Sequence, residues 1–475
     1  MKNFKESSTS NPLSNFVNCI VFISCLIFGI YIILSLALVP NALLLWQYHS
    51  ANSVHNSSST IITSLEHIAF GIAASDKSWS RRKEYVRLWW RPEVMKGCVF
   101  LEQMPPISEN DRVSLPPICI SADTSRFKYT NKYGRRSAIR VARVVSETVA
   151  LMNNNSDVRW FVFGDDDTVF FPDNLVKTLQ KYDHGLWYYI GTNSEYFETN
   201  KGNSFEMAFG GAGFAISSPL AKVLGKVLDS CLIRYHGVYG SDARIHICLA
   251  ELGVSLTHEP GFHQMDMKGN IFGLLTAHPI RPLISLHHID KLYPIFPNMR
   301  SLEALIQLVK AAKADPERIL QQTVCYDQLS STFSVSWGYA IQQWRWNALL
   351  RDIIRAQETY IPWNKNENYD VDTQRYDPNP CKRPDVFFFD SVSSNRDGTT
   401  SIYKKADRNC TKNKNKIDVI RVSSKKLDLN AKQMQAPRRQ CCDVLQSSSS
   451  ARSSVIDIGI RECGAEELIQ MKLQE

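Results

Sequence analysis

The chain lacks several features that would point to common functions. None of its 12 cysteines belongs to a Cys-x-x-Cys pair, so we predict no structural zinc site. Its last histidine is His288, and the region past about residue 300 contains neither an acidic cluster nor a glycine-rich loop, so we expect any catalytic residues to lie before residue 300.

The formal net charge of +8 is small for 475 residues, and much of it lies between Lys404 and Lys426. This pattern indicates a solvated basic loop, and we expect no nucleic-acid partner.

Charged residues are also absent from a long apolar segment near the amino terminus. The 24 residues from Phe16 to Val39 meet the roughly 20 that a helix needs to cross a bilayer. A cleaved secretory signal has a shorter apolar centre, so an uncleaved anchor fits better. Lys2 and Lys5 in residues 1–15 favour a cytoplasmic amino terminus, with the rest of the chain lumenal.

The segment after this span has the composition of a lumenal protein. Residues 40–64 are rich in Ser, Asn and Thr and are predicted to form a flexible stem. Ten cysteines lie beyond the span, an even number that is compatible with disulfides in an oxidising compartment, although their pairing stays open. Acceptor triplets for N-glycosylation occur at Asn56, Asn154 and Asn409 and fit the same topology.

An acidic triplet, Asp165, Asp166 and Asp167, follows directly on an apolar run. The run, Trp160 to Phe163, is typical of a strand buried on both faces, and Gly164 then allows the chain to turn. Two unit charges about 5 Å apart repel by roughly 3 kcal/mol at an effective dielectric near 20, so we expect a compensating cation. Alternate residues of an extended segment project the same way, so Asp165 and Asp167 are predicted to face one Mn²⁺ or Mg²⁺ ion. The alternative is a solvated acidic turn.

Short apolar runs alternate with helical patterns ahead of the triplet. The expected strands cover residues 68–74, 97–101 and 118–122, and the expected helices cover 81–90 and 138–152. That order predicts an α/β fold with a Rossmann-like parallel sheet. Ligands of such sheets bind outside the carboxyl ends of the strands, where the acidic triplet falls.

Two further motifs follow the triplet. The segment Gly210-Gly211-Ala212-Gly213 holds three glycines in four residues, which lets backbone approach a ligand closely, although a tight turn is the alternative. Asp242 opens a predicted helix, and a role in helix capping is the alternative to a chemical one.

The pattern changes after the first domain, which we place at residues 65–300. Two helical stretches, 302–312 and 316–324, precede aromatic, extended segments, and we predict an accessory module over residues 301–431. Its expected task is to pack against the first domain or to present an acceptor to it. Residues 432–475 are predicted to be disordered apart from a short helical patch at 466–471.

The order and spacing of these motifs resemble the fringe-type beta-1,3-glycosyltransferases over roughly residues 65–290. The likeness rests on the acidic triplet, on the Gly-Gly-Ala-Gly-Phe segment about 45 residues later, and on Ser241-Asp242 followed by Gly261-Phe262-His263. The anchor and the additional module are similar to the plant fringe-related branch. The resemblance implies a GT-A fold, a UDP-sugar donor, a manganese ion, transfer with inversion to a glycan or glycoprotein, and a Golgi membrane protein of type II.

The resemblance also implies roles for individual residues. Asp167, in the Asp-x-Asp motif, matches the aspartate that binds the metal, while Asp165 and Asp166 match carboxylates near the nucleotide ribose and the ion. Asp242 matches the general base that removes the proton of the acceptor hydroxyl. The segment that lines the donor sugar matches Gly211, Ala212 and Gly213.

One motif departs from the family. Fringe enzymes have Phe-His-x-His after the base helix and use the second histidine on the metal, whereas this chain has Phe262-His263-Gln264-Met265. His263 is therefore one candidate for the metal ligand. The alternative is the pair His287 and His288, which is similar to the His-His of core-1 galactosyltransferases.

The leading hypothesis is a metal-dependent, inverting glycosyltransferase that forms a beta-1,3 linkage. One rival is a catalytically silent fringe-like fold that serves as a lumenal binding or scaffold protein. Another is a lumenal nucleotide-sugar hydrolase. Which hexose or N-acetylhexosamine is donated does not follow from the sequence, because the candidate sugars differ by single hydroxyl orientations or substituents.

Overall fold

The computed structural model describes residues 22–34, 62–327, 331–363, 368–407, 410, 417–445 and 454–470. The chain divides into two units, residues 1–62 and 63–475. In the first unit, residues 22–34 form a helix, whereas the rest of the predicted span 16–39, the tail 1–15 and the stem up to residue 61 lie outside the described residues. Within the part of the chain that is described, no helix is both long and apolar enough to span a membrane.

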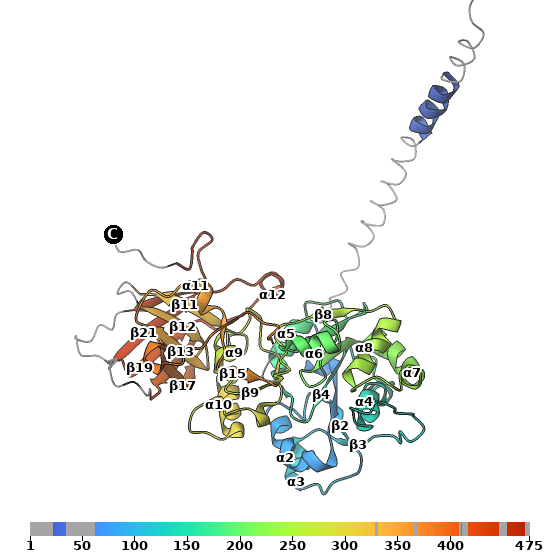
Figure 1. Ribbon diagram of the computed structural model, residues 1–475, viewed down its shortest axis with the longest axis horizontal. Coiled ribbons are helices and arrows are strands. Elements are labelled where there is room, and N and C mark those ends of the chain that lie inside the picture. Colours follow the sequence, from blue (N-terminus) through green and yellow to red (C-terminus); the bar gives the residue numbers. More distant parts are fainter. Residues whose placement is uncertain are drawn as a thin grey trace, which may run out of the picture. The chain divides into compact units, whose positions relative to one another are not determined.

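A seven-stranded sheet organises the first part of residues 63–475 (Figure 1). Its strand order is β3-β2-β1-β4-β7-β6-β8. The strands are β1 Ile68–Ala73, β2 Lys96–Leu101, β3 Ile118–Ile120, β4 Trp160–Asp165, β6 Tyr189–Gly191, β7 Phe214–Ser217 and β8 Leu256–His258. Only β7 runs against its neighbours, because β3, β2, β1 and β4 pair in parallel and β6 pairs in parallel with β8. The predicted α/β fold with a Rossmann-like sheet is confirmed.

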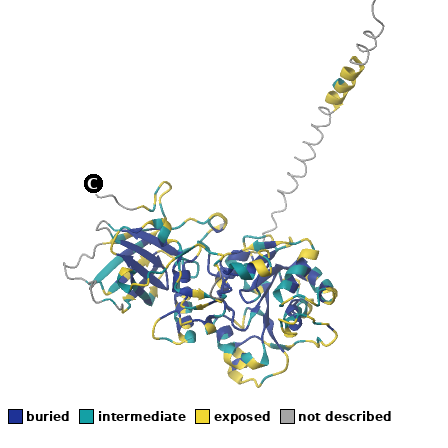
Figure 2. Cartoon of the chain, viewed as in Figure 1, coloured by how far each residue is buried: buried dark blue, intermediate teal, exposed yellow. Residues whose placement is uncertain are grey.

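The two central strands are buried on both faces, as the unbroken apolar run predicts. β1 and β4 pair in register from Ile68 opposite Trp160 to Ala73 opposite Asp165. Alternate side chains enter two separate cores: Trp160 and its like-facing neighbours pack with helices α2 and α5, and Phe161 packs with α4, α7 and α8. Both layers appear as buried interior in Figure 2.

Helices cover both faces of this sheet. The helices in this part of the chain are α2 Asp76–Arg87, α3 Glu109–Ser114, α4 Ser137–Leu151, α5 Pro172–Leu179, α6 Phe197–Gly202, α7 Ser218–Arg234, α8 Asp242–Glu251 and α9 Phe272–Thr276. The helix expected to open at Asp242 is present, and the chain leaves it through Gly253 at φ +75°. That backbone region is the one in which glycine is favoured at helix ends.

A second sheet of eight strands follows helix α10, Ser301–Ala314. Its order is β11-β12-β13-β17-β18-β19-β21-β20, and all neighbours pair antiparallel except β19 with β21. The strands are β11 Gln322–Tyr326, β12 Thr332–Ser336, β13 Ala340–Trp344, β17 Asp385–Ser394, β18 Thr399–Lys405, β19 Val419–Ser424, β20 Cys441–Leu445 and β21 Val455–Arg461. The expected helix at 316–324 is wrong, because a turn there leads directly into β11.

The predicted disorder of residues 432–475 is also wrong for most of the segment. Helix α12, Ala431–Gln435, reaches into it, and β20 and β21 complete the second sheet. The helical patch expected at 466–471 does not form over the described residues 462–470. The pairing of β21 with both β19 and β20 explains the order, since its backbone groups are hydrogen-bonded on both sides.

All ten cysteines beyond residue 62 form disulfides, as their even number suggested. The pairs are Cys98–Cys119, Cys231–Cys248, Cys325–Cys442, Cys381–Cys410 and Cys441–Cys463. Cys325–Cys442 fixes β20 to β11, and Cys441–Cys463 joins β20 to the chain after β21, so the carboxyl-terminal segment is an integral part of the fold.

Short elements lie outside the two sheets. β5 Val169–Phe170 pairs with β10 Ser285–Leu286, and β9 Met267–Gly269 pairs with β15 Tyr360–Pro362. The remaining elements are η1 Leu65–His67, η2 Ile289–Lys291, η3 Pro380–Lys382, α11 Leu350–Ile353, β14 Ala356–Gln357 and β16 Thr373–Gln374. The β9–β15 pair joins a segment of the second module to the loop region that follows β8.

Candidate functional site

The acidic triplet lies at the carboxyl end of β4, where the sheet topology predicts a ligand crevice. Asp165 is the last residue of the strand, and the chain turns at Asp166 and Asp167, not at Gly164 as expected. Gly164 continues the strand opposite Ile72, and a side chain there would lie 3.0 Å from the ring of Phe170. Close packing thus explains this glycine.

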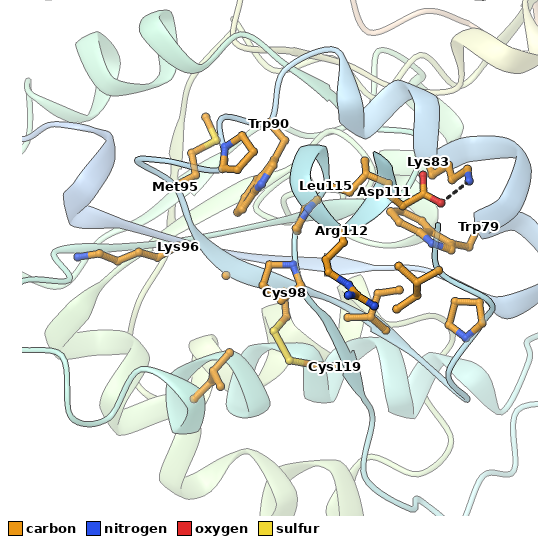
Figure 3. Close-up of a pocket in the computed structure, with 18 of the residues that line it drawn as sticks. Trp79, Lys83, Trp90, Met95, Lys96, Cys98, Asp111, Arg112, Leu115 and Cys119 are labelled. Atoms are coloured by element: carbon orange, nitrogen blue, oxygen red, sulfur yellow. Dashed lines mark hydrogen bonds and ion pairs between the residues drawn. A yellow bond between two sulfur atoms is a disulfide. The ribbon is translucent and has the colours of Figure 1, made fainter. Parts of the chain in front are cut away.

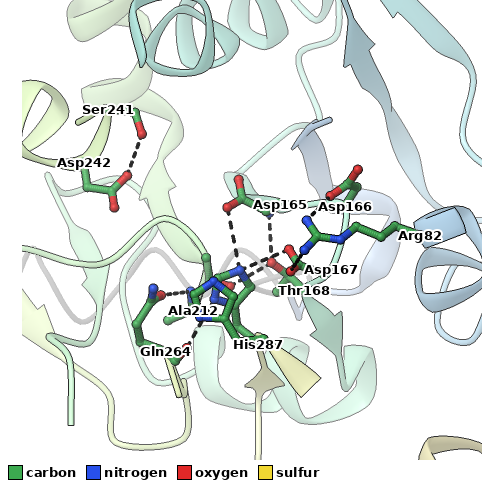
Figure 4. Close-up of polar contacts among 12 residues, drawn as sticks. Arg82, Asp165, Asp166, Asp167, Thr168, Ala212, Ser241, Asp242, Gln264 and His287 are labelled. Carbon is green, nitrogen blue, oxygen red and sulfur yellow. Dashed lines mark hydrogen bonds and ion pairs between the residues drawn. The ribbon is translucent and has the colours of Figure 1, made fainter. Parts of the chain in front are cut away.

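The three carboxylates point in two directions (Figure 4). Asp165 and Asp167 face His287, whose Nε2 lies 3.8 Å from Oδ2 of Asp165 and 3.1 Å from Oδ1 of Asp167. Asp166 turns away and accepts a hydrogen bond from the Ser78 hydroxyl at 2.6 Å. The alternating orientation predicted from the sequence is the one observed, whereas the binding of an ion remains a prediction.

An arginine that the sequence analysis missed lies beside the triplet. Arg82 of helix α2 forms ion pairs with Asp166 at 3.0 Å, Asp167 at 2.8 Å and Asp290 at 2.9 Å. Ser78 and Arg82 are four residues apart and therefore share one face of α2. The available signal was that α2 directly follows β1, the neighbour of β4, so a cation on its inner face can reach the carboxylates.

His287 and His288 follow the short strand β10. Their rings lie 3.7 Å apart between centroids, and His288 has a left-handed backbone at φ 56°. Such a conformation is uncommon for a residue with a side chain and clusters at functional sites. Together with Asp167, the two histidines place possible ligand atoms within 4.8 Å of one another.

The orientation of His287 is fixed by its neighbours. Its Nδ1 lies 3.2 Å from the carbonyl oxygen of Gln264, so Nδ1–H donates there and Nε2 faces Asp167. Histidines that bind metals commonly donate their second ring nitrogen in this way. Gln264 also holds the glycine segment, because its side-chain oxygen accepts a hydrogen bond from the Ala212 backbone at 2.8 Å.

His263, the other candidate ligand, has different partners. Its Nδ1 lies 3.2 Å from Glu195, and its Nε2 lies 2.9 Å from Nε2 of His278. Burial holds the pKa of His278 well below its usual range, with the charge of His263 as a smaller cause. Met265, where fringe enzymes have the second histidine, is fully buried and donates its backbone N–H to Glu195 at 2.9 Å. Of the two alternatives, only His287 and His288 are brought together with Asp167 among the described residues.

The electrostatics of the site follow from the burial of its side chains and from their charges. Burial raises the pKa of Asp165 to about 7, and the charges of Asp167 and Asp242 add to this increase while His287 opposes it. Burial also raises the pKa of Asp166, whereas the charges of His287 and Arg82 overcome burial and hold the pKa of Asp167 well below its usual range. The chain therefore keeps one carboxylate of the triplet firmly ionised.

The pKa of His287 is shifted in the complementary direction. Burial alone would lower it, but the carboxylates of Asp167 and Asp165 raise it to about 9. Burial lowers the pKa of the neighbouring His288. The pKa values of the two adjacent rings are thus shifted in opposite directions, because the carboxylates favour the charged form of His287 and burial favours the neutral form of His288.

The glycine segment lies between Asp242 and the histidine pair. A methyl group at Gly210 would lie 2.8 Å from Oδ1 of Asp242, and one at Gly211 would overlap the imidazole of His287. The carbonyl of Gly211 accepts a hydrogen bond from Thr168 at 2.7 Å, which connects the segment to the triplet. These glycines provide the space in which two functional side chains lie.

Asp242 begins helix α8 on the far side of this segment (Figure 4). Its Oδ1 accepts a hydrogen bond from Ser241 at 2.8 Å. Burial raises its pKa, although the hydrogen bonds from Ser241 and the Gly210 backbone oppose the increase. A carboxylate with a raised pKa at the mouth of a crevice has the properties of a general base.

The geometry is compatible with a divalent cation. Ligand atoms at adjacent corners of an octahedron with bonds of about 2.1 Å lie about 3 Å apart. The distances from Nε2 of His287 to Asp167 and Asp165, 3.1 and 3.8 Å, are close to this spacing. Carboxylate oxygens suit Mg²⁺ and Mn²⁺, and an imidazole ligand favours Mn²⁺ of the two.

A separate cavity of about 900 Å³ lies beside strands β2 and β3 (Figure 3). Trp79, Trp90 and Met95 contribute to its largely apolar wall, together with the Cys98–Cys119 disulfide. Lys96 and Cys98 of β2 line it together with Pro105 and Pro106, whereas no residue of the acidic triplet does. Helix α2 separates the two regions, with Trp79 facing the cavity and Ser78 facing Asp166.

Comparison with known proteins gives a family match and a likeness to solved structures. A family model described as "Protein of unknown function, DUF604" matches residues 199–442, slightly more than half of the chain. A glycosyltransferase "involved in the glycosylation of the major capsid of PBCV-1" is similar at 10% identity and a TM-score of 0.27, over 50% of this chain and 96% of that chain. No curated protein matches the chain. The family match includes the glycine segment, Asp242 and the histidine pair, and it extends through most of the second sheet.

Proposed function

The chain belongs to the DUF604 family of proteins of unknown function, and we propose that it is a metal-dependent glycosyltransferase. In this proposal it transfers a hexose or N-acetylhexosamine from a UDP-sugar to a hydroxyl group of a glycan or glycoprotein, with inversion and formation of a beta-1,3 linkage. The observation that carries the proposal is the meeting of Asp167 with His287 and His288 at the carboxyl end of β4, with Asp242 across the glycine segment.

Each side chain has a role in this reaction. The carboxylates of Asp165 and Asp167 and the imidazole of His287, with His288 beside it, would hold Mn²⁺ or Mg²⁺. A bound ion of this kind neutralises charge that develops on the departing diphosphate. Asp242 accepts the proton of the acceptor hydroxyl while that oxygen bonds to the anomeric carbon and the bond from this carbon to the diphosphate breaks. Inversion follows because the acceptor attacks from the face opposite the leaving group.

The segment Gly211 to Gly213 would line the donor sugar, and its direct contact with His287 supports this placement. Asp166 would lie near the ribose. In this proposal the protein is a Golgi membrane protein of type II that is anchored through residues 16–39. The five disulfides support an oxidising compartment, because such bonds are rare in the cytosol.

A catalytically silent fold is the second candidate, and one observation favours it. Arg82 already forms ion pairs with Asp166 and Asp167, so the clustered carboxylates are compensated without a metal. A protein that only binds a lumenal partner could keep the triplet for that structural reason.

Release of UDP separates the two candidates. A panel of UDP-sugars is incubated with the purified protein in Mn²⁺ and in EDTA, with and without methyl β-glycosides as acceptors. We expect release with at least one donor, loss in EDTA, and a decrease of at least 100-fold in Asp167→Asn. Asp173→Asn is the matched control, because Asp173 lies six residues after Asp167, in α5, and forms an exposed ion pair with Arg91. Release that survives EDTA or Asp167→Asn would contradict the metal role, and no release with any donor would favour the silent fold.

A further inference from the structure

The second module contributes an aromatic side chain to the candidate site. The indole of Trp363 stacks on the ring of His288, with 6.0 Å between centroids and 30° between planes, and His288 in turn stacks on His287. Three rings therefore lead outward from Asp167. Trp363 is the outermost of the three rings and is 40% exposed, so part of its indole is accessible to a ligand.

Backbone pairing holds Trp363 in this position. Strand β15 directly precedes it and pairs with β9, with Ile361 opposite Lys268 and Pro362 opposite Met267. The hydroxyl of Thr359 donates to the carbonyl of Asn270 at 2.7 Å. Trp363 is therefore fixed by the same loop region that carries the histidine-binding Gln264.

The chain that follows residues 364–367 is fixed to the other side of the site. The backbone of Asp370 donates to the Glu195 carbonyl at 2.9 Å, and its carboxylate accepts from Asn193 and Asn200 at 3.1 and 2.9 Å. Residues 356–363 and 368–374 thus contact the loops after β8 and β6, respectively.

A lysine accompanies the indole. The ammonium of Lys268 lies 5.0 Å from the Trp363 ring centroid and donates to the Trp363 carbonyl at 3.1 Å. An ammonium has three donors, so it can also donate to a sugar hydroxyl. An aromatic face with a donor at its rim is the combination that binds a pyranose, through the apolar C–H face of the ring and through its hydroxyl groups.

The position of Trp363 favours the acceptor over the donor. His288 Nδ1 lies 3.6 Å from Oδ1 of Asp266. Asp266 in turn accepts a hydrogen bond at 3.2 Å from Gln264, whose side-chain oxygen accepts from the Ala212 backbone. Trp363 thus connects through His288 and Asp266 to the glycine segment, whose Gly210 lies against Asp242, the candidate base that must contact the acceptor hydroxyl.

We propose that Trp363 and Lys268 form an acceptor-binding platform, in which the indole stacks on a pyranose ring of the acceptor and presents its hydroxyl group toward Asp242. This inference rests on the proposed glycosyltransferase function and adds a substrate-contacting residue from the second module. It assigns that module a direct part in substrate binding.

The first test separates acceptor from donor. With the best donor and methyl β-glycoside from the panel above, Trp363→Ala raises the KM for the acceptor about tenfold, the order expected for loss of one aromatic contact. The KM for the donor and the rate of donor hydrolysis without acceptor stay within twofold. Trp363→Phe retains part of the affinity. Trp346→Ala is the matched control, because Trp346 lies in the same module and is 48% exposed.

An unchanged acceptor KM in Trp363→Ala overturns the platform, and so does a change confined to the donor KM.

A second readout does not need turnover. The protein is labelled with 5-fluorotryptophan, the ¹⁹F resonance of Trp363 is assigned with Trp363→Phe, and methyl β-glycosides of glucose, galactose and N-acetylglucosamine are added at millimolar concentration. A shift of this resonance supports the platform even if no UDP-sugar is used, whereas the absence of a shift with all three overturns it. Failure of the proposed function and failure of the platform therefore give different results.

Discussion

Gly211 lies directly against the imidazole of His287, so that even a methyl group at this position would overlap the ring. The ring itself is held by the Gln264 carbonyl on one side and faces Asp167 on the other. His287 therefore has little room to move if Gly211 acquires a side chain. Gly210, its neighbour, stands in a similar relation to Asp242.

Gly211→Ala is expected to displace His287 and to abolish metal-dependent turnover, with a decrease of about 100-fold or more, since a displacement near 1 Å can have that effect. The measurement is UDP release at saturating Mn²⁺, alongside circular dichroism to verify folding. Gly202→Ala is the control, because no atom lies within 4 Å of the added methyl position. Full activity in Gly211→Ala would show that His287 has no role in turnover.

Gly210→Ala is expected to act on the base alone. The added methyl group would lie 2.8 Å from Oδ1 of Asp242, a side-chain atom that can rotate away, so we expect a smaller decrease in kcat, about 10- to 100-fold. Stabilisation of the protein by Mn²⁺ should be retained. Loss of that stabilisation would mean that the two glycines do not serve separate side chains.

Substitution of each candidate histidine shows which of the two, His287 or His263, binds the metal. Mn²⁺ at 100 times its Kd should increase the free energy of unfolding of the wild type by about 2.7 kcal/mol. His287→Asn should lose this increase, while His263→Asn should keep it despite a lower starting stability from the lost bonds to Glu195 and His278. Thermal unfolding with and without Mn²⁺ measures this stabilisation in each variant. If His263→Asn lost it and His287→Asn kept it, His263 would be the metal ligand.

The acid limb of the pH profile should depend on Ser241. The hydroxyl of Ser241 donates to Asp242 and stabilises its charged form, while burial raises the pKa of this carboxyl. Because a general base must be ionised, kcat/KM should decrease as the pH falls through the pKa of Asp242. Ser241→Ala should raise that pKa further and move the acid limb to higher pH. Ser230→Ala, an exposed serine on α7, should leave the profile unchanged.

The Cys325–Cys442 disulfide should be important for the stability of the second sheet. It connects residues 117 positions apart, so Cys325→Ala/Cys442→Ala should decrease the free energy of unfolding by about 2–5 kcal/mol. Cys381→Ala/Cys410→Ala opens a loop with a separation of 29 and should have an effect about 1 kcal/mol smaller on entropic grounds. Denaturant unfolding of both variants gives the comparison, and equal stability of all forms would contradict it.

Local sequence patterns predicted the parts of the site that depend on local structure. The apolar run before Asp165 identified a strand buried on both faces, and the alternation of side chains predicted that Asp165 and Asp167 face the same way. The resemblance supplied Asp242 and the two candidate histidine sites, but the choice between them needed the positions of Gln264 and Asp167 in space.

Contacts between distant segments were not predictable. Arg82 reaches the triplet only because α2 packs beside β4, and Trp363 reaches His288 only because β15 pairs with β9. The carboxyl-terminal segment was predicted to be disordered because its serine-rich composition was given more weight than its alternating apolar residues. The alternating pattern from Val455 to Ile460 is typical of a strand, and Cys441 and Cys463 are available to fix it.

The position of β20 and β21 has a consequence for biosynthesis. A ribosome adds residues from the amino terminus onward, so Cys325 emerges long before its partner Cys442, and β19 has no neighbour on one edge until Val455 to Arg461 have been made. Closure of the second sheet must then wait until Arg461 has been translated. A chain truncated before Val455 would carry an unpaired Cys441 and an open edge on β19, and such features favour aggregation and removal by cellular quality control.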